Sequence, residues 1–556
     1  MNTVAAHAYF TRASGAFGIN VSGEGSTAKP IVWSIAGSDS GGGAGLQADL
    51  KALAAFGVHG CTAVAAITAQ NSVAVARVEA VSADLLDAQL AALAQDMPPQ
   101  AIKTGLLGSV ENLRVVCRWV DRLRAGGRTL ALVVDPVLGS STGAGFANEA
   151  MVLAYVNELL PRSTLVTPNC DEAQRLLAAA EYGGVGMGME AMARALSQLA
   201  SPPLAVSITG GDASPQDGTA NDWLRSSQAS GWLSLPRVDT AHQHGTGCTF
   251  ASTAAAALAS GYCVADAVVL AKMATTHALR HGYAAGEGAG PVHAQPDFAQ
   301  HIANLPALLP PGGAGPVNAF GGSASVASVA FRPLRDPALG VYAVVDSAAW
   351  VRRVLAAGIR TVQLRIKDPL EPTLEVQIRE SIAAANATPG AQLFINDHWA
   401  LALRLGAYGV HLGQEDLDRV DLDALRHAGV RLGLSTHSYW EVCRACALRP
   451  SYIACGPIFA TQSKDMPWIP QGLDNLRYWA SLLPIPVVGI AGIDARNVAD
   501  VAATGAASAA VITAITQAPD AEAACRQLFA EFARGQGLLR EGCPTRARST
   551  LQPVGD

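Results

Sequence analysis

The stretch "IVWSIAGSDSGGGAGLQADLKALAAFG", residues 31–57, holds an apolar strand, a glycine-rich turn and an alanine-rich helix in direct succession. A buried strand followed by a helix is the βα unit from which α/β folds are built. The four glycines between residues 41 and 45 let the backbone adopt a positive φ or approach a bound group closely. A ligand site and a plain structural turn are equally compatible with this pattern.

Short apolar runs alternate with helical stretches from here to about Ile302, which predicts a mostly parallel sheet. The runs are "IVWSIAG", "TAVAAIT", "AIKTGLL", "LALVVDPVL", "TLVTPN" and "LAVSITGG". The chain from Leu305 to Phe331 is dense in Pro, Gly, Ala and Ser, without charge or period, and is typical of a linker. We therefore expect a first α/β domain over residues 30–304 and a linker over residues 305–337.

A second series of apolar runs follows the linker: "GVYAVVD", "TVQLRIKD", "QLFIND", "GVHLGQ", "RLGLSTH", "YIACGPIF", "PVVGIAGI" and "AAVITAI". Eight strand candidates, each followed by a helix-length segment, are the number that a (β/α)8 TIM barrel requires. Polar residues gather at the C-terminal end of these runs, which is the face that carries the active site in such barrels. We expect the barrel over residues 338–534 and a tail over residues 535–556.

The composition is that of a large α/β enzyme. Of the 556 residues, 50% are hydrophobic and 15% are charged, and the formal net charge is −6. The chain therefore lacks the basic face that nucleic-acid binding needs, and no apolar run reaches the roughly 20 residues of a membrane span. These features predict small-molecule partners, with neither nucleic acid nor membrane, and they are compatible with a homo-oligomer.

The cysteines and the N-terminal segment predict a cytoplasmic location. Ten cysteines are scattered without the dense spacing of a disulfide scaffold. Cys443 and Cys446 form a lone CxxC pair within a helical pattern, which we assign to helix packing rather than zinc. Residues 1–29 contain one Arg and no compact apolar region, which indicates a disordered extension rather than a signal peptide.

A cysteine stands at the start of a predicted helix in "HQHGTGCTFASTAAAALASG", residues 242–261. The backbone amides of residues 245–248 would point into the helix N-terminus, where the helix dipole favours an anion such as a transferring phosphoryl group. The same position lowers the pKa of a thiol, so Cys248 is a candidate general base for an alcohol that attacks ATP. The alternative role for Cys248 is that of a small buried hydrophobe.

The first domain resembles the hydroxymethylpyrimidine and phosphomethylpyrimidine kinases of thiamin biosynthesis, a branch of the ribokinase-like fold. The resemblance covers about residues 31–304 and rests on an ordered set of motifs: "AGSDSGGGAGLQADLKA", "AITAQN", "KTGLL", "VVDPV", "VTPNCDEA", "TGGD" and "HGTGCTF". Relatives in the wider fold usually have aspartate at position 248, whereas cysteine is characteristic of this branch. The resemblance therefore implies that Cys248 is the catalytic base.

The same resemblance implies that Gly37, Asp49 and Gln70 bind the pyrimidine, whose aminopyrimidine edge suits an amide because an amide both donates and accepts. The site for ATP, Mg²⁺ and phosphate would comprise Asp135, Asn169, Glu172, Thr209, Gly210, Gly211, Gly245, Thr246 and Gly247. A helix cap is the alternative role for Asn169, which precedes the helical "DEAQRLLAAA". We assign no role to Lys103, which fits a solvated lysine equally well.

Polar residues at the strand ends of the second domain indicate a phosphate-rich ligand. Gln363, Arg365 and Lys367 alternate in "TVQLRIKD" and would share one side of a strand, where two cations are costly unless an anion binds. Asp397 in "FINDHW" and Asp416 in "GVHLGQED" suit a Mg²⁺ ion that bridges a diphosphate, although a helix N-cap is the alternative for either. The stretch "GPIFATQSKD" and the ends of the last two strands supply further phosphate-binding groups.

These motifs, in this order, resemble thiamin-phosphate synthase over about residues 341–517. The resemblance implies that the pyrimidine diphosphate is bound by Gln363, Arg365, Lys367, Asn396, Ser435 and Lys464, and its Mg²⁺ by Asp397 and Asp416. The thiazole phosphate would be bound by Thr461, Ser463, Gly492, Ile512 and Thr513. Ser463, Ala491 and Thr513 stand where the family usually has Thr, Gly and Ser, and each keeps the hydroxyl or the small size.

Together the two resemblances imply a bifunctional transferase that uses Mg²⁺, with ATP as co-substrate. One alternative is a pyridoxal-type kinase fused to another phosphate-binding barrel enzyme. A second alternative is a non-catalytic sensor of the thiamin pathway, which has no need to retain all of Cys248, Asp397, Asp416 and Lys464.

Overall fold

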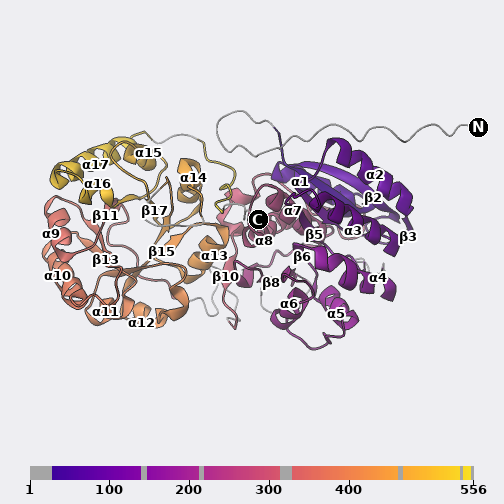
Figure 1. Ribbon diagram of the computed structural model, residues 1–556, viewed down its shortest axis with the longest axis horizontal. Helices are drawn as coiled ribbons and strands as arrows, with labels where there is room; N and C mark the ends of the chain where they lie inside the picture. The colour runs from indigo at the N-terminus through magenta and orange to yellow at the C-terminus, as the bar shows by residue number, and fades with distance from the viewer. Residues whose placement is uncertain are drawn as a thin grey trace, which may run out of the picture.

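The computed structural model describes residues 28–139, 147–211, 218–312, 329–460, 468–538 and 542–551. Two α/β domains lie side by side along the longest axis, the first half of the chain forming one and the second half the other (Figure 1). Among the described residues, no helix combines the length and the apolar character that crossing a bilayer requires.

The first domain is built on a ten-stranded sheet with the strand order β10-β9-β8-β7-β6-β5-β4-β1-β2-β3. The parallel strands are β1 (Ile31–Asp39), β2 (His59–Gln70), β4 (Ala101–Thr104), β5 (Ala131–Val134), β6 (Leu165–Val166) and β7 (Ala205–Ile208). Antiparallel strands flank them: β3 (Val75–Ala80), β8 (Thr219–Arg225), β9 (Ser230–Pro236) and β10 (Ala307–Leu309). The predicted, mostly parallel sheet is therefore confirmed at its centre.

Helices cover both faces of this sheet, which explains why its central strands are almost continuously apolar. The helices are α1 (Gly45–Phe56), α2 (Ala83–Asp96), α3 (Val110–Arg124), α4 (Glu149–Ala154), α5 (Cys170–Ala179), α6 (Met189–Ser197), α7 (Thr246–Ala259) and α8 (Val264–Arg280). Helix α7 contacts α1, α8 and the central strands β4 and β5. Its run of alanines is buried, and the small side chains allow this close packing.

The second domain is the predicted barrel, with its eight parallel strands closed by pairing of the last with the first. The strands are β11 (Gly340–Val345), β12 (Thr361–Leu364), β13 (Gln392–Asn396), β14 (Gly409–Leu412), β15 (Arg431–Thr436), β16 (Tyr452–Cys455), β17 (Val487–Ile490) and β18 (Ser508–Val511). Each overlaps one of the eight predicted runs, and β18 begins one residue before its run. The helices are α9 (Ala348–Ala356), α10 (Leu374–Ala387), α11 (Trp399–Arg404), α12 (Leu422–His427), α13 (Tyr439–Leu448), α14 (Gly472–Leu482), α15 (Val498–Ala502), α16 (Thr513–Thr516) and α17 (Ala521–Gln536).

The stretch predicted as a linker is packed at both of its ends. Strand β10 pairs with β9 and contacts α13 of the barrel, and all three of its residues are buried. Beyond residues 313–328, which lie outside the described residues, Phe331 and Leu334 are buried, and the Phe331 amide donates to the carbonyl of Arg449. The Pro- and Gly-rich composition concealed these ordered ends because each consists of only a few residues.

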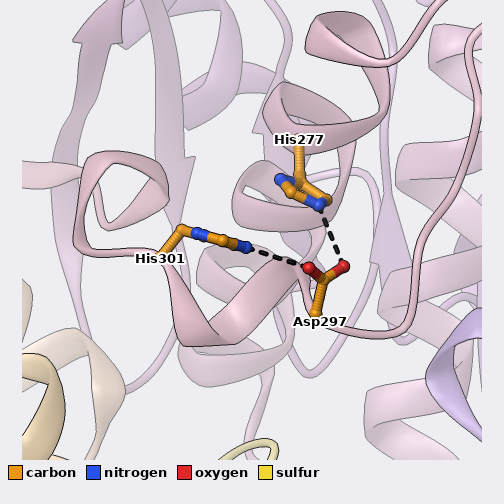
Figure 2. A group of neighbouring side chains, drawn as sticks. All are labelled: His277, Asp297 and His301. Carbon is orange, nitrogen blue, oxygen red and sulfur yellow. Dashed lines mark hydrogen bonds and ion pairs between the residues drawn. The ribbon is translucent and has the colours of Figure 1, made fainter.

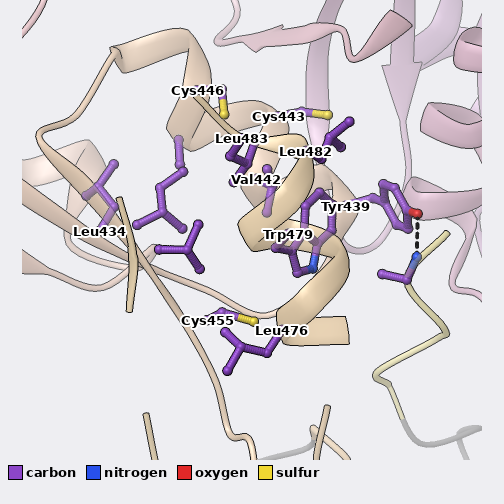
Figure 3. Close-up of a cluster of buried hydrophobic side chains, with 14 of the residues drawn as sticks. Leu434, Tyr439, Val442, Cys443, Cys446, Cys455, Leu476, Trp479, Leu482 and Leu483 are labelled. Atoms are coloured by element: carbon purple, nitrogen blue, oxygen red, sulfur yellow. Dashed lines mark hydrogen bonds between the residues drawn. The ribbon is translucent and has the colours of Figure 1, made fainter. Parts of the chain in front are cut away.

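The C-terminal segment 542–551 lies between the two domains. The Tyr262 hydroxyl of the first domain donates to the carbonyl of Ala547 at 2.6 Å. The amide of Ala547 donates to the Tyr439 hydroxyl of the barrel at 2.9 Å, the bond that is dashed at Tyr439 in Figure 3. The Arg546 guanidinium lies 4.0 Å from the ring centre of Phe56. One continuous cluster of buried side chains includes residues of both domains, so the domains share part of their apolar core.

The CxxC pair belongs to this shared region. Cys443 and Cys446 lie in α13, buried among apolar side chains that include Val442 and Leu483, and neither forms a disulfide (Figure 3). Burial raises the pKa of both thiols, which therefore stay protonated and apolar in character. The predicted packing role of the pair is confirmed.

Candidate active sites

A cavity of about 640 Å³ opens where the central strands of the first sheet end. Most of the predicted kinase residues line it: Gly37, Gln70, Asp135, Asn169, Glu172, Thr209, Gly245, Thr246, Gly247 and Cys248. They lie near the C-terminal ends of strands β1, β2, β5, β6 and β7, or at the starts of helices α5 and α7. This is the crevice at the carboxyl ends of parallel strands in which open α/β sheets bind ligands.

The two glycine motifs meet at the base of this cavity. Helix α7 begins directly after Gly245, which has a φ of 87°. A Cβ atom at Gly245 would lie 2.2 Å from the carbonyl oxygen of Gly43, and one at Gly45 would lie 2.3 Å from that of Gly37. Glycine is therefore required at both positions for the backbones to touch, so the structural role considered for the first turn is present.

A buried ion-pair network lies beneath the cavity. The Nζ atom of Lys103 lies 2.8 Å from Oδ1 of Asp49 and 3.7 Å from Oδ2 of Asp135. Asp49 is completely buried and also accepts hydrogen bonds from Ser34 and Ser252. Its oxygens are occupied and it does not line the cavity, so the structure does not support its predicted contact with the pyrimidine.

Lys103 is a cavity residue that sequence reasoning missed. Its side chain is completely buried, yet it lines the cavity between two carboxylates. Isolated buried lysines are very rare because desolvation of the ammonium group is costly. Its position within the short apolar strand β4 was the available signal, since a lysine at a fully buried strand position needs an anionic partner.

The same network sets the charges near Cys248. Burial raises the pKa of the Cys248 thiol to about 12, and the carboxylates of Asp49 and Asp135 add to the increase, although Lys103 opposes it. Burial likewise raises the pKa of Asp135 to about 6, against the effect of Lys103. The predicted lowering of the thiol pKa is therefore wrong, because burial and two nearby anions raise it.

Asn169 and Glu172 form the capping box of α5. The Asn169 side chain accepts a hydrogen bond from the amide of Glu172, and Glu172 accepts one from the amide of Asn169. The helix-cap alternative for Asn169 is thus confirmed, and both residues also line the cavity. Gly210 and Gly211 do not line it, and a Cβ at Gly210 would lie 2.1 Å from the carbonyl oxygen of Asn221.

Asp39 and His244 are two further cavity residues that were not predicted. Asp39 accepts hydrogen bonds from the backbone amides of the glycine turn, at Gly41, Gly43 and Ala44. His244 Nε2 lies 3.3 Å from Asp39 Oδ2 and 3.3 Å from the Gln70 amide nitrogen. Burial opposes ionisation of Asp39, but these hydrogen bonds, led by that of His244, hold its pKa below the ordinary value. Asp39 is therefore ionised, and its carboxylate holds the glycine-rich turn through these backbone amides.

A second cavity of about 700 Å³ opens at the carboxyl ends of the barrel strands. It is lined by the predicted residues Gln363, Arg365, Asn396, Asp397, Asp416, Ser435, Gly492, Ile512 and Thr513. Lys367 is exposed and does not line it, because β12 ends at Leu364 and the chain no longer alternates beyond that point. The predicted residues Thr461, Ser463 and Lys464 lie outside the described residues.

The carboxylates of Asp397 and Asp416 both line the barrel cavity. Burial raises the pKa of Asp397, the nearby charge of Asp416 raises it further, and Arg365 opposes the shift. Asp397 has a φ of 59°, a left-handed conformation that is uncommon outside glycine and is frequent at functional sites. Two oxygen donors that repel each other, beside the Asn396 amide, suit a hard cation such as Mg²⁺.

The turn after β17 is shaped by two residues with positive φ. Gly492 has a φ of 69°, and a Cβ there would lie 2.6 Å from Phe459 Cβ. Ala491 has a φ of 78°, which an alanine adopts at a cost of about 1–2 kcal/mol. Glycine is the usual residue at position 491 in the family that the barrel resembles, and this conformation explains why.

Three side chains of the first domain offer the donor types of a metal site: His277, Asp297 and His301 (Figure 2). Asp297 bridges the two imidazoles, at 3.1 Å from His277 Nε2 and 3.0 Å from His301 Nε2. The Asn304 amide nitrogen donates to His277 Nδ1, and its orientation is fixed because its oxygen accepts from Arg280. His277 therefore carries its proton on Nε2, directed at Asp297, so that nitrogen has no lone pair for a metal.

Comparisons with known proteins agree with this division into two domains. A family model described as phosphomethylpyrimidine kinase matches residues 39–293, and one described as thiamine monophosphate synthase matches residues 341–515. Thiamine-phosphate synthase of Serratia proteamaculans (strain 568) is 54% identical over 198 residues, which are 35% of this chain and 93% of that protein. Among solved structures, an ADP complex of Bacillus subtilis pyridoxal kinase is 29% identical. The match covers 48% of this chain and 98% of the pyridoxal kinase chain, with a TM-score of 0.43.

One relative spans both domains. The probable thiamine biosynthetic bifunctional enzyme, chloroplastic, of Oryza sativa subsp. japonica is 33% identical over 521 residues, which are 90% of this chain and 88% of that protein. The predicted combination of a ribokinase-like α/β domain with a TIM barrel is confirmed. The chain belongs to the family of bifunctional thiamine biosynthetic enzymes, and it joins a phosphomethylpyrimidine kinase domain to a thiamine monophosphate synthase domain.

Proposed function

We propose that the first domain phosphorylates 4-amino-5-hydroxymethyl-2-methylpyrimidine and then its monophosphate with ATP. The barrel joins the resulting diphosphate to hydroxyethylthiazole phosphate, releasing pyrophosphate and yielding thiamin monophosphate. The observation that carries this proposal is the pair of separate cavities, each lined by groups that bind anions and each within the region matched by the corresponding family.

In the kinase cavity, the amides at the start of α7 favour the phosphoryl group as it transfers, since the helix dipole and unpaired N–H groups stabilise an anion. Cys248 is the proposed base, by resemblance to the family. Asp135 is an alternative proton acceptor, because its pKa of about 6 leaves it ionised at neutral pH whereas the thiol is protonated. Asn169 and Glu172 are the proposed groups near Mg²⁺ and the phosphates, and Asp135 is proposed to act in the same charged cluster.

We expect the kinase kcat/KM to fall as the pH drops below about 6, because Asp135 becomes protonated there and Lys103 loses an anionic partner. The initial rate is measured between pH 5 and 8 with the native chain, Asp135→Asn and Cys248→Ala. The acidic limb is expected to disappear in Asp135→Asn and to persist, at a lower overall rate, in Cys248→Ala. A native profile that is flat down to pH 5 would contradict the role of Asp135.

In the barrel, Arg365 and Asn396 are proposed to hold the pyrimidine diphosphate together with Lys464, and Asp397 and Asp416 to hold Mg²⁺. The ion supplies positive charge that neutralises the leaving pyrophosphate. The thiazole phosphate is assigned to the turn of Gly492 and the start of α16, where the barrel fold commonly binds phosphate. Ile512, Thr513, Thr461 and Ser463 complete that proposed site.

Several broader expectations accompany this function. We propose a first domain from about residue 30 to Leu309, which includes β10, and a barrel domain from about residue 338 to the end of α17 at Gln536. We also propose a cytoplasmic location and small-molecule partners only. Mg²⁺ is the proposed metal of both sites. A homo-oligomer is compatible with the chain.

The experiment that tests the function supplies the full chain with ATP, Mg²⁺, the hydroxymethylpyrimidine and the thiazole phosphate. We expect thiamin monophosphate to form, detected by chromatography after oxidation to a fluorescent product. When thiazole phosphate is omitted, the pyrimidine diphosphate is expected to accumulate instead. Preferential phosphorylation of pyridoxal, or absence of the coupled product, would contradict the proposal.

A further inference from the structure

Five polar side chains form a continuous hydrogen-bonded chain across the interior of the barrel. The Gln363 amide nitrogen lies 3.3 Å from the Tyr342 hydroxyl, which lies 2.9 Å from the Tyr452 hydroxyl. The Tyr452 hydroxyl lies 2.8 Å from His411 Nδ1, and His411 Nε2 lies 2.9 Å from Ser435 Oγ. The residues come from five different strands, and all except Ser435 are buried.

A glycine in a neighbouring strand makes room for these hydrogen-bonded side chains. A Cβ at Gly433 of β15 would lie 2.1 Å from the Tyr452 ring, so only glycine at that position allows the ring to cross the strand. The rings of His411 and Tyr452 stack at 5.7 Å with 23° between their planes. Gln363, His411 and Ser435 line the cavity, whereas the two buried tyrosines do not. The series of hydrogen bonds therefore connects two residues that line the cavity, Gln363 and Ser435, through side chains that include the buried tyrosines.

Two directions are open to these hydrogen bonds, because either tyrosine hydroxyl can donate to the other. With the Gln363 amide nitrogen donating to the Tyr342 oxygen, the direction that gives the Tyr342 proton a partner sends it to Tyr452. Tyr452 then donates to His411 Nδ1, which leaves the single proton of the neutral imidazole on Nε2. Burial and the charge of Arg365 lower the pKa of His411 to about 4, in keeping with a neutral ring.

We propose that Tyr452 and His411 are positioning residues that set Ser435 as a hydrogen-bond donor to the bound pyrimidine. Because Ser435 Oγ accepts the Nε2 proton of His411, its own proton is directed into the cavity. The ligand atom opposite Ser435 is then an acceptor, such as an unprotonated ring nitrogen or a diphosphate oxygen, and an N–H group would be rejected there. This inference rests on the proposed synthase function of the barrel.

The first test compares three Tyr→Phe variants of the full chain in the coupling reaction, starting from the pyrimidine diphosphate and thiazole phosphate. Tyr452→Phe is expected to lower kcat/KM about tenfold, because His411 loses the partner that fixes its tautomer. Tyr342→Phe is expected to lower it less than threefold, because Tyr452 still donates to His411. Tyr408→Phe is the matched control and should leave the rate unchanged. The Tyr408 hydroxyl contacts Gln392 and Arg335, which do not belong to the five hydrogen-bonded side chains.

The second test reads the proton on His411 directly. Nitrogen NMR of the full chain with ¹⁵N-labelled histidine is expected to show the Nε2-protonated neutral form down to about pH 5, with His411 assigned by its loss in His411→Asn. In Tyr452→Phe, both tautomers should appear. His411→Gln, whose amide nitrogen takes the place of Nε2, is expected to retain more coupling activity than His411→Asn.

The outcomes separate this inference from the function on which it rests. An Nδ1-protonated or charged His411 at pH 7 in an active native chain would overturn the inference alone, as would an unchanged kcat/KM in Tyr452→Phe. A native chain that forms no thiamin monophosphate would overturn the proposed function instead. If Tyr452→Phe fails to fold, as judged by its thermal melt, the comparison of His411→Gln with His411→Asn decides.

Discussion

The substitution Asp397→Asn is expected to lower thiamin monophosphate formation by about 10²–10³-fold and to leave the kinase reaction unchanged. The amide cannot supply the negative charge that, with Asp416, is proposed to hold Mg²⁺, so the leaving pyrophosphate loses its stabilisation. Asparagine tolerates the left-handed conformation of this position, with its φ of 59°, so the variant is expected to fold. The two half-reactions are measured separately, with the pyrimidine diphosphate supplied for the coupling step.

The matched control is Asp423→Asn, which neutralises an exposed carboxylate on α12 that pairs only with Arg426 among the described contacts. This variant should keep both activities. An Asp397→Asn protein with native coupling would remove Asp397 from the metal site. Loss of both activities in that protein would instead indicate a folding defect.

Lys103→Met is expected to abolish kinase activity and to destabilise the first domain by about 3–5 kcal/mol, the typical cost of leaving a buried charge without its partner. Asp49 and Asp135 would then face each other without a cation, and the pKa of Asp135 would rise above its present value of about 6. The free energy of unfolding is measured by urea titration, with kinase rates taken on the folded fraction.

The double substitution Asp49→Asn with Lys103→Met is the control for this network. It removes both charges of the ion pair, so it should recover part of the stability that Lys103→Met loses. Together with the single variants Lys103→Met and Asp49→Asn, it forms a double-mutant cycle that gives the coupling energy of the pair. Kinase activity should stay low in both proteins, because Asp135 still lacks its cation. A Lys103→Met protein with native stability would show that the charge of Lys103 is dispensable.

The sequence predicted the barrel better than it predicted the sites. Each of the eight apolar runs contains a strand, because burial on both faces leaves a continuous apolar signal in the residues themselves. Strand β10 escaped notice because three apolar residues beside a Pro- and Gly-rich stretch carry no periodicity. Local pattern therefore predicts an element only when the element is long enough to show a period.

The site residues show a related limit. The motifs located most of the residues that line the kinase cavity. Asp49, which was expected to contact the pyrimidine, is covered, whereas Lys103, to which no role was assigned, lines the cavity. Sequence alone indicated that both are polar within apolar surroundings, but it could not show that they neutralise each other. The thiol of Cys248 was misjudged for the same reason, since its pKa depends on carboxylates supplied by distant strands.

The C-terminal segment, residues 542–551, contacts both domains and so connects them physically. Ala547 is held by one tyrosine from each half, and Leu551 pairs with Trp468, whose ring stacks on His437 at the wall of the barrel cavity. Residues 547–551 thus link the two domains and contact the wall of the barrel cavity through Trp468 and His437. Excision of either half would therefore expose apolar surface that the other half now covers.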